Sequence, residues 1–271
     1  MRITSVFALL LVSFTTATWA SELKGVGSMF IAPLFTNWSS SYAQHVKVNT
    51  SVKYEAVNAS EGIKRISNKS IDFGQTDMPL NIDELNEKGL FQFPAILVAF
   101  TPIFNLPGVE SGQLRLDGKT LGDIFMGKVT KWNDPAIAAL NWNVNLPNET
   151  IKLAYRTKGT SGTYVFSNYV AKYNPEWKET MGVGLTVPWR VGQGTESIKE
   201  LGDYIKQTPY SLAVTEFSYV LKNRIKYVQL KNRDGQFVKP SPDSVSEAAK
   251  LAKWDAANGF YVDLNDQAGA K

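Results

Sequence analysis

Short apolar runs alternate with amphipathic stretches along the chain, and this pattern predicts strands followed by helices. The predicted strands are rich in Val, Ile, Leu, Phe and Tyr and lie at residues 52–57, 71–74, 93–106, 151–156, 211–214 and 226–230. Apolar residues at helical spacing predict helices at residues 60–68, 121–125, 163–172, 197–206, 217–222 and 244–254, and another that begins near Pro33. This alternation is typical of an α/β protein with mixed sheets.

The first twenty residues have the pattern of a secretory signal peptide. Arg2 supplies the positive charge, residues 6–12 are apolar, and Thr18-Trp19-Ala20 is a small-x-small cleavage site. A membrane anchor is the alternative, because residues 3–20 are uncharged. Their many Ser and Thr residues make the stretch weakly apolar for a membrane span. We therefore expect cleavage near Ala20 and an exported protein.

Composition narrows the function by exclusion. The chain has 271 residues, a formal net charge of +4, one histidine and no cysteine. Thiolate metal sites, disulfides and thiol catalysis are therefore impossible, and a Ser-His-Asp hydrolase would depend on His45 alone. His45 has no acidic or histidine neighbour at ligand spacing, so we interpret it as a surface residue. No long basic run occurs, which argues against a nucleic-acid partner. We expect no metal and no cofactor.

The strongest local signal is a predicted strand, then Gly159–Thr163 (Gly-Thr-Ser-Gly-Thr), then a predicted helix. Glycines let the backbone approach a ligand closely, and the first turn of a helix offers unpaired N–H groups with a positive partial charge. Arg156 at the end of the strand would clamp an oxyanion at the same place. An ordinary N-capping loop is the alternative. The loop is not a P-loop, since no Gly-Lys-Ser/Thr ends it.

Two weaker candidates lie nearer the N-terminus. Gly25–Phe30, which includes Ser28, precedes the helix near Pro33 and is equally consistent with a simple strand–helix turn. Asp77 follows a predicted strand, where a carboxylate is usually a cap or turn residue. If it faced an anion site, this acceptor-only group would select a ligand that still carries a proton.

Five segments together resemble the phosphate-binding proteins of bacterial phosphate ABC importers. They lie at residues 25–33, 71–80, 89–94, 116–125 and 128–133, and the run from Asp117 to Asn133 is the most specific of them. The resemblance covers essentially the whole chain after residue 20. It implies a type II periplasmic-binding-protein fold, in which two α/β lobes joined by a hinge enclose phosphate in a cleft. We expect lobe 1 at residues 21–105 and lobe 2 at residues 106–271.

The resemblance also implies which residues bind the ligand. In that family one arginine, one aspartate and several neutral donors hold phosphate, and the aspartate accepts a hydrogen bond from the protonated anion and thereby excludes sulfate. Asp77 matches the aspartate and Arg156 matches the arginine. The neutral donors match Phe30, through its backbone N–H, and the loop residues Thr160, Ser161 and Gly162.

The sequence departs from the family pattern at several of these positions. Met29 stands where a Thr is usual, and Ala59 matches a binding Ser, with Ser60 next to it. In an ungapped match, Thr160 takes the place of another binding Ser. If the match is shifted by one residue, Thr163 compensates for that Ser. Lys158 replaces an aspartate that normally partners the arginine, so the site should be more positive. Fewer neutral donors predict weaker phosphate binding or a different oxyanion.

The end of the sequence differs as well. The family returns to the first lobe beyond the point that matches residues 265–271, with a strand and C-terminal helices. This sequence stops there, as a piece of a longer protein or as a short paralogue. In a short paralogue, the first lobe would expose an apolar patch or an open strand edge, and hinge closure would be impaired.

Three functions follow in order of preference. The first is a monomeric solute-binding protein, without enzymatic activity, that captures inorganic phosphate in the periplasm and delivers it to the membrane permease of an ABC importer. The second is a binding-impaired paralogue that acts as a surface, adhesion or sensor protein. The third is an exported phosphatase, which the single histidine and the lack of a carboxylate–histidine metal cluster disfavour.

Overall fold

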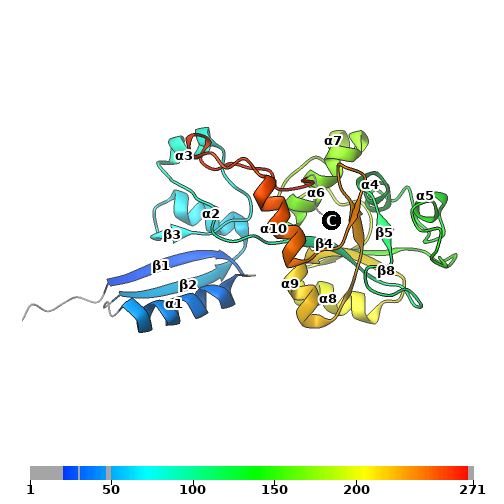
Figure 1. The fold of residues 1–271 in the computed structure, drawn as a ribbon, viewed down its shortest axis with the longest axis horizontal. Helices are drawn as coiled ribbons and strands as arrows, with labels where there is room; N and C mark the ends of the chain where they lie inside the picture. Colours follow the sequence, from blue (N-terminus) through cyan, green and yellow to red (C-terminus); the bar gives the residue numbers. More distant parts are fainter. Residues whose placement is uncertain (1–20, 30, 47–49, 268–271) are drawn as a thin grey trace, which may run out of the picture.

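The computed structural model describes residues 21–29, 31–46 and 50–267. It forms two lobes that lie side by side along the long axis of the molecule (Figure 1). Strands and helices alternate in both lobes, so the predicted α/β class is confirmed. The predicted signal peptide and Phe30 lie outside the described residues. No helix within the described ranges is long and apolar enough to cross a membrane.

The first lobe is built on three parallel strands. These are β1 (Ser21–Ser28), β2 (Thr50–Val57) and the short β3 (Phe73–Gly74), which lie in the order β2-β1-β3. β1 and β2 pair along their whole length. The helices of this lobe are α1 (Ala32–Val46), α2 (Ala59–Ser67) and α3 (Ile82–Lys88). Helix α1 runs along β1 and β2 (Figure 1).

The second lobe is built on a larger mixed sheet with the strand order β7-β6-β8-β4-β9. Its strands are β4 (Phe100–Asn105), β6 (Lys152–Arg156), β7 (Gln193–Thr195), β8 (Ser211–Glu216) and β9 (Lys226–Tyr227). A smaller sheet, in the order β11-β10-β5, contains β5 (Arg115–Leu116), β10 (Gln229–Lys231) and β11 (Phe237–Val238).

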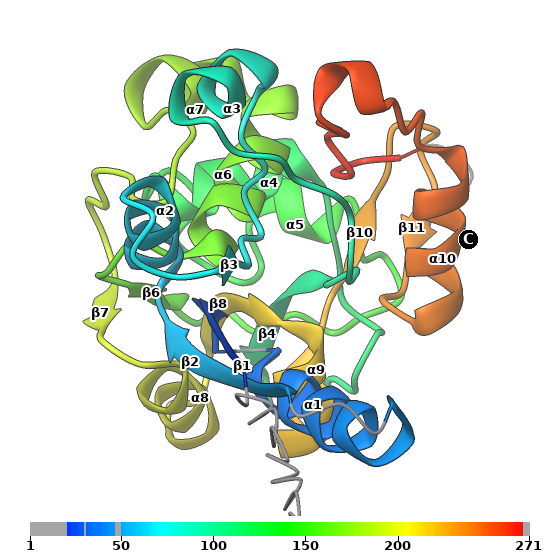
Figure 2. The same ribbon diagram turned by 90° about the vertical axis from the view of Figure 1, so that its left-hand side faces the viewer.

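The second lobe also contains six helices among its described residues, and some of them cover the two faces of the larger sheet. The six helices are α4 (Gly118–Phe125), α5 (Pro135–Ala138), α6 (Ser161–Tyr173), α7 (Pro175–Thr180), α8 (Ile198–Gln207) and α9 (Phe217–Asn223). Figure 2 shows α4 and α6 on one side of the sheet and α8 on the other. Such coverage buries both faces and requires apolar strands, which the runs at β4 and β8 provide.

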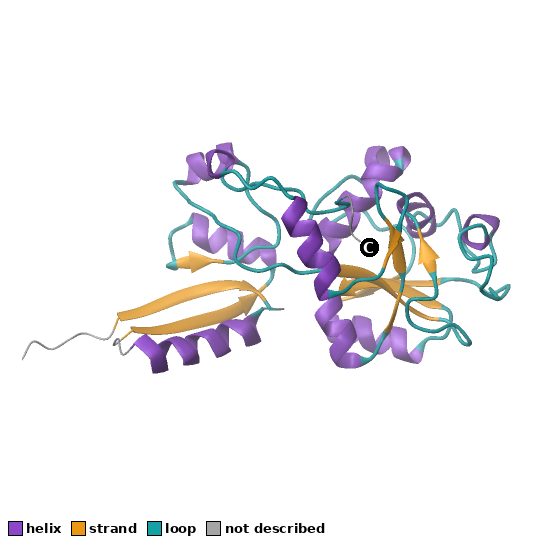
Figure 3. Ribbon diagram, in the orientation of Figure 1, coloured by secondary structure: helices purple, strands orange, loops and turns teal. Residues whose placement is uncertain are grey.

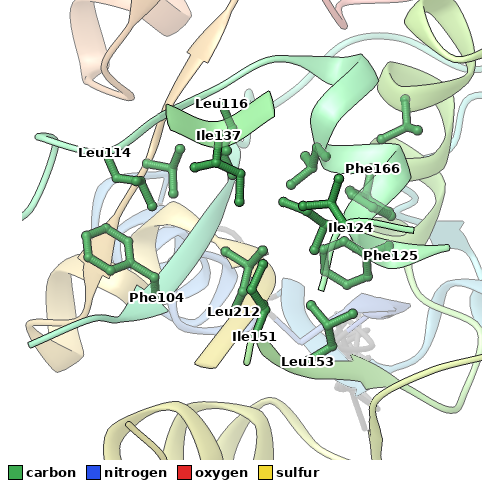
Figure 4. Close-up of a cluster of buried hydrophobic side chains, with 14 of the residues drawn as sticks. Phe104, Leu114, Leu116, Ile124, Phe125, Ile137, Ile151, Leu153, Phe166 and Leu212 are labelled. Atoms are coloured by element: carbon green, nitrogen blue, oxygen red, sulfur yellow. The ribbon is translucent and has the colours of Figure 1, made fainter. Parts of the chain in front are cut away.

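The core of the second lobe is dense and aromatic. Phe104, Phe125, Phe166 and Leu212 pack among aliphatic side chains from both sheets and from α4 (Figure 4). Trp132 is fully buried in the same cluster, and its Nε1 donates to the carbonyl oxygen of Tyr210 at 3.1 Å. This core supports the strand ends from which the site described below is built.

The apolar run predicted as one strand at residues 93–106 divides into two parts. Residues 100–105 form β4, which pairs antiparallel with β8 from Phe100 opposite Glu216 onward. Residues 91–99 belong to no helix or strand and are drawn as loop in Figure 3, so the strand prediction is wrong there. An apolar run becomes a strand only where a partner strand satisfies its backbone groups. Sheet membership puts residues 100–105 with the second lobe, one strand earlier than the predicted division at residue 105.

The C-terminal segment contacts both lobes. It comprises α10 (Pro242–Leu251) and a short 3-10 turn, η1 (Ala256–Asn258). Gln92 donates through Nε2 to the carbonyl oxygen of Gly259 at 2.7 Å, which ties the segment to the first lobe. The Nζ of Lys172 in α6 lies 3.0 Å from a carboxylate oxygen of Asp263, and this ion pair ties the segment to the second lobe. The segment therefore bridges the two lobes (Figure 1).

Candidate anion-binding site

The predicted strand, loop and helix around residues 151–172 are present in the second lobe. β6 ends at Arg156, and α6 begins at Ser161. Thr160 caps the helix, since its Oγ1 accepts a hydrogen bond from the backbone N–H of Thr163 at 3.2 Å. The two threonine hydroxyls also bond to each other at 3.0 Å. The expected donors Thr160 and Thr163 thus hold the loop in shape through their side chains.

The first turn of α6 leaves two backbone donors open. The N–H groups of Ser161 and Gly162 have no acceptor among the described residues, whereas the N–H of Thr160 donates to Leu185 at 2.9 Å. A helix of 13 residues adds the positive end of its dipole at this point. This part of the loop therefore offers donors and a positive dipole end to an anion, and anion binding here stays a prediction.

Arg156 is half-buried beside this loop. One terminal nitrogen donates to the carbonyl oxygen of Glu196 at 2.8 Å, while its Nε is buried and has no partner among the described residues. Burial lowers the pKa of the guanidinium from its ordinary value, and the charge of Glu200 opposes this. The group remains charged, because arginine does not lose its proton in proteins. A buried, unpaired N–H on a cation is costly unless a ligand accepts its hydrogen bond.

Lys158 forms an ion pair beside this donor set. Its Nζ lies 3.1 Å from a carboxylate oxygen of Glu196, and both side chains are largely exposed. The expected excess of positive charge near Arg156 is therefore balanced by Glu196. An exposed pair of this kind contributes little to stability, on the order of 1 kcal/mol or less.

Asp77 lies in the first lobe, just after β3. Its Oδ1 accepts a hydrogen bond from Nε2 of Gln75 at 2.8 Å, and the Oε1 of Gln75 accepts the backbone N–H of Ser28 at 2.9 Å. The second carboxylate oxygen, Oδ2, is buried and has no partner among the described residues. Burial and then the charge of Asp77 raise the pKa of Tyr54, whose hydroxyl donates to the carbonyl oxygen of Ser28. Asp77 is thus an orientated acceptor with one free oxygen.

The remaining candidate residues of the first lobe differ in burial and in their distance from the loop of the second lobe. Ser28 is buried at the end of β1, and Met29 beyond it is exposed. Ala59 is the first residue of α2, which Asn58 caps. The hydroxyl of Ser60 lies only 2.9 Å from the position that a Cβ on Gly159 would take. The structure therefore brings Ser60 against the loop of the second lobe. The absence of a side chain at Gly159 permits this approach.

Two cavities adjoin these groups. A small one, of about 30 Å³, is lined by Arg156, Thr160, Gly162 and Thr163 together with aromatic side chains. A large one, of about 910 Å³, is lined by Asp77 and by apolar residues of both lobes. Both cavities share the walls formed by Phe100, Phe166 and Val214. Asp77 and Arg156 therefore open onto neighbouring spaces rather than onto one enclosed pocket.

Several residues of this region were not found from the sequence. Gln75 sets the orientation of Asp77, and its place two residues earlier in the same motif is the signal that would have found it. Glu216 is 5% exposed, and burial followed by the charge of Asp77 raises its pKa. Trp189 and Thr215 line the small cavity with Arg156. These last three are far along the chain from Asp77, so no local spacing reveals them.

Metal-binding side chains are not clustered in the described part of this region. The described residues contain no cluster of three or more His, Asp or Glu side chains that could hold a metal ion. His45 is exposed on α1, as predicted, and its Nδ1 lies 2.7 Å from the carbonyl oxygen of Ser41.

The chain is similar to proteins of one known family. The PBP superfamily domain matches residues 13–267. The phosphate-binding protein PstS of Pasteurella multocida is 38% identical over 262 residues, which cover 97% of this chain and 76% of that protein. The phosphate-binding protein PstS of Haemophilus influenzae is 36% identical over 252 residues, with 93% and 75% covered.

A solved structure shows the same fold. An ABC-type phosphate transport receptor from Vibrio cholerae matches with a TM-score of 0.55 at 18% identity, over 85% of this chain and 82% of that one. This likeness agrees with the expected type II periplasmic-binding-protein fold. On its sequence and its fold together, the chain belongs to the PBP superfamily and, within it, to the family of PstS phosphate-binding proteins.

Proposed function

We propose that this protein captures inorganic phosphate in the periplasm and delivers it to the permease of an ABC importer. The observation that carries the proposal is a matched pair of unsatisfied buried atoms. Arg156 presents a donor without a partner, and Asp77 presents an acceptor without a partner. A ligand that satisfies both must accept one hydrogen bond and donate another.

Inorganic phosphate has this double character at neutral pH. Its unprotonated oxygens would accept from the Arg156 guanidinium and from the open N–H groups of Ser161 and Gly162. Its remaining proton would be donated to the free Oδ2 of Asp77. Sulfate carries no proton at this pH, so it would leave a carboxylate facing an oxyanion without a hydrogen bond between them. The site therefore favours phosphate over sulfate.

Binding would close the lobes on the anion. Asp77 and Ser60 come from the first lobe, while Arg156 and the start of α6 come from the second, and their two cavities adjoin. A tetrahedral anion between the lobes would make contacts that neither lobe supplies alone, which favours the closed form. We propose further that residues 1–20 direct export and are removed, and that the mature protein works as a monomer without enzymatic activity.

A binding-impaired paralogue remains the second candidate. Met29 and Ala59 supply no side-chain donor where the family has Thr and Ser. Phe91 and Phe93 are 75% and 68% exposed, which fits a protein whose first lobe docks on something else. Phosphate binding in solution separates the two candidates.

The test is calorimetric titration of the purified, ligand-stripped protein with phosphate. We expect saturable binding that falls roughly 30-fold or more in Arg156→Ala and in Asp77→Ala, since each removes one partner of a buried charged contact. Arg190→Ala and Asp83→Ala, which remove exposed charges of the same kind, are the matched controls and should bind as the wild type does. A folded wild-type protein that gives no heat with phosphate would contradict the proposal.

A further inference from the structure

Trp189 is a residue of the small cavity to which no role has been given. It lies in the segment between α7 and β7, and it lines the cavity with Arg156, Gly162 and Thr163. Its Nε1 is buried and has no hydrogen-bond partner among the described residues. A buried donor left unpaired costs about 1–3 kcal/mol, so its retention calls for an explanation.

Two other tryptophans, Trp132 and Trp177, have a hydrogen-bond partner for the indole N–H. Trp132 donates through Nε1 to the carbonyl oxygen of Tyr210 at 3.1 Å, and Trp177 donates to that of Gly182 at 3.0 Å. The indole N–H groups of these two core tryptophans are thus hydrogen-bonded. Trp189 differs from both in lining the cavity that Arg156 lines.

The Trp189 ring is held firmly in place. It stacks on Tyr155 with ring centroids 4.9 Å apart and an interplanar angle of 23°, and on Phe166 at 5.9 Å and 25°. Its backbone N–H also donates to Val187 at 2.9 Å. The N–H therefore cannot turn toward another acceptor without breaking these stacks, and its orientation is fixed before any ligand binds.

The chemistry of the cavity selects an anion. Two of its lining residues carry a buried, unpaired donor, the Nε of Arg156 and the Nε1 of Trp189, and no Asp or Glu of the described residues lines it. A volume of about 30 Å³ is enough for one or two water-sized groups. Only one or two oxygens of a tetrahedral anion fit into this small cavity. The other oxygens of the anion would lie on the side of Asp77.

We propose that Trp189 is a further ligand of the anion and that its indole N–H donates to an oxygen of bound phosphate. This inference rests on the proposed function. It adds a hydrogen-bond donor to the part of the site that contains Arg156, whereas Asp77 supplies an acceptor. It also compensates for a side-chain donor that is lacking at Met29.

The test is Trp189→Phe, which keeps an aromatic ring for the stacks and removes the N–H together with the five-membered ring that carries it. Because a hydrogen bond to a charged group contributes more than a neutral one, we expect phosphate affinity to fall about tenfold or more by calorimetry. Trp177→Phe is the matched control, since it removes an indole N–H from the same aromatic cluster that is already bonded to Gly182. Its phosphate affinity should equal that of the wild type.

A second readout does not depend on the variant's stability. In ¹⁵N-labelled wild-type protein, the indole N–H resonance of Trp189 should shift strongly when phosphate is added, and that of Trp132 should hardly move. Unchanged affinity in Trp189→Phe, or an indole resonance that ignores phosphate in a protein that binds it, would overturn the inference and leave the proposed function standing. A wild-type protein that binds no phosphate would overturn both.

Discussion

Both lobes supply residues to the proposed site, but they differ in how much apolar surface they cover by themselves. In the second lobe a continuous cluster contains side chains with no exposure at all, among them Trp132, Trp177, Leu116 and Leu212. The first lobe has few buried apolar side chains, and several large ones are exposed: Leu23, Met29, Trp38, Tyr42, Phe91, Phe93 and Leu97. Arg156 is therefore positioned by a self-sufficient core, whereas Asp77 is positioned by a thin three-stranded sheet.

The largest expected effect comes from removing a core tryptophan. Trp132→Ala should lower the free energy of unfolding by about 3–5 kcal/mol, because it opens a cavity in a fully packed cluster and removes one of the two donors to the Tyr210 carbonyl, the other being the backbone N–H of Lys152. Trp38→Ala in the first lobe should cost about 1 kcal/mol or less, since that side chain is 45% exposed. Urea unfolding measures both. Equal costs would contradict the difference drawn between the lobes.

A glycine of the first lobe offers the next largest effect. A Cβ on Gly27 would lie 2.3 Å from the carbonyl oxygen of Gln75, the residue that orientates Asp77. Gly27→Ala should therefore displace the Asp77 segment and weaken phosphate binding by about 1–3 kcal/mol in titration calorimetry. Gly62→Ala is the control, because its Cβ would meet nothing closer than 3.5 Å. Equal phosphate affinity in Gly27→Ala and the wild type would show that Asp77 does not depend on this contact.

A smaller, pH-dependent effect is expected from Glu216. Burial, and then the charge of Asp77, raise its pKa in the folded protein. The folded state thus keeps a proton that the unfolded chain loses from about pH 4.3 upward, so this group destabilises the fold as the pH rises through that window. Relative to the wild type, Glu216→Gln should become more stable as the pH rises from 4 to 8, while the exposed Glu179→Gln should show no such trend. Urea unfolding at several pH values checks this, and parallel curves for Glu216→Gln and the wild type would contradict it.

Local chemistry made part of this structure predictable. The turn from β6 through Gly159–Thr163 into α6 follows from glycines, a threonine cap and an apolar helix face, all adjacent in sequence. The helices at α2, α8 and α10 follow from the same kind of local pattern. Where partners lie close in sequence, the residues themselves decide the structure.

Features that depend on distant partners were not predictable. β1 was missed because Gly25 and Gly27 weaken its strand pattern, although pairing with β2 along its whole length stabilises it. Residues 93–99 have a strand-like composition but no strand partner in the structure. Trp189 and Glu216 reach the site only through packing of the second lobe, so neither spacing nor composition marks them.

The most direct test of the account is to compare phosphate and sulfate binding in the wild type and in Asp77→Asn. On the proposed function, the free Oδ2 of Asp77 accepts a hydrogen bond from a protonated oxygen of the ligand and repels an anion that carries no proton. Titration calorimetry should therefore show that the wild type binds phosphate and rejects sulfate, and that Asp77→Asn, whose amide can donate, binds sulfate with measurable affinity. Sulfate binding by the wild type as tight as phosphate binding, or unchanged selectivity in Asp77→Asn, would contradict it.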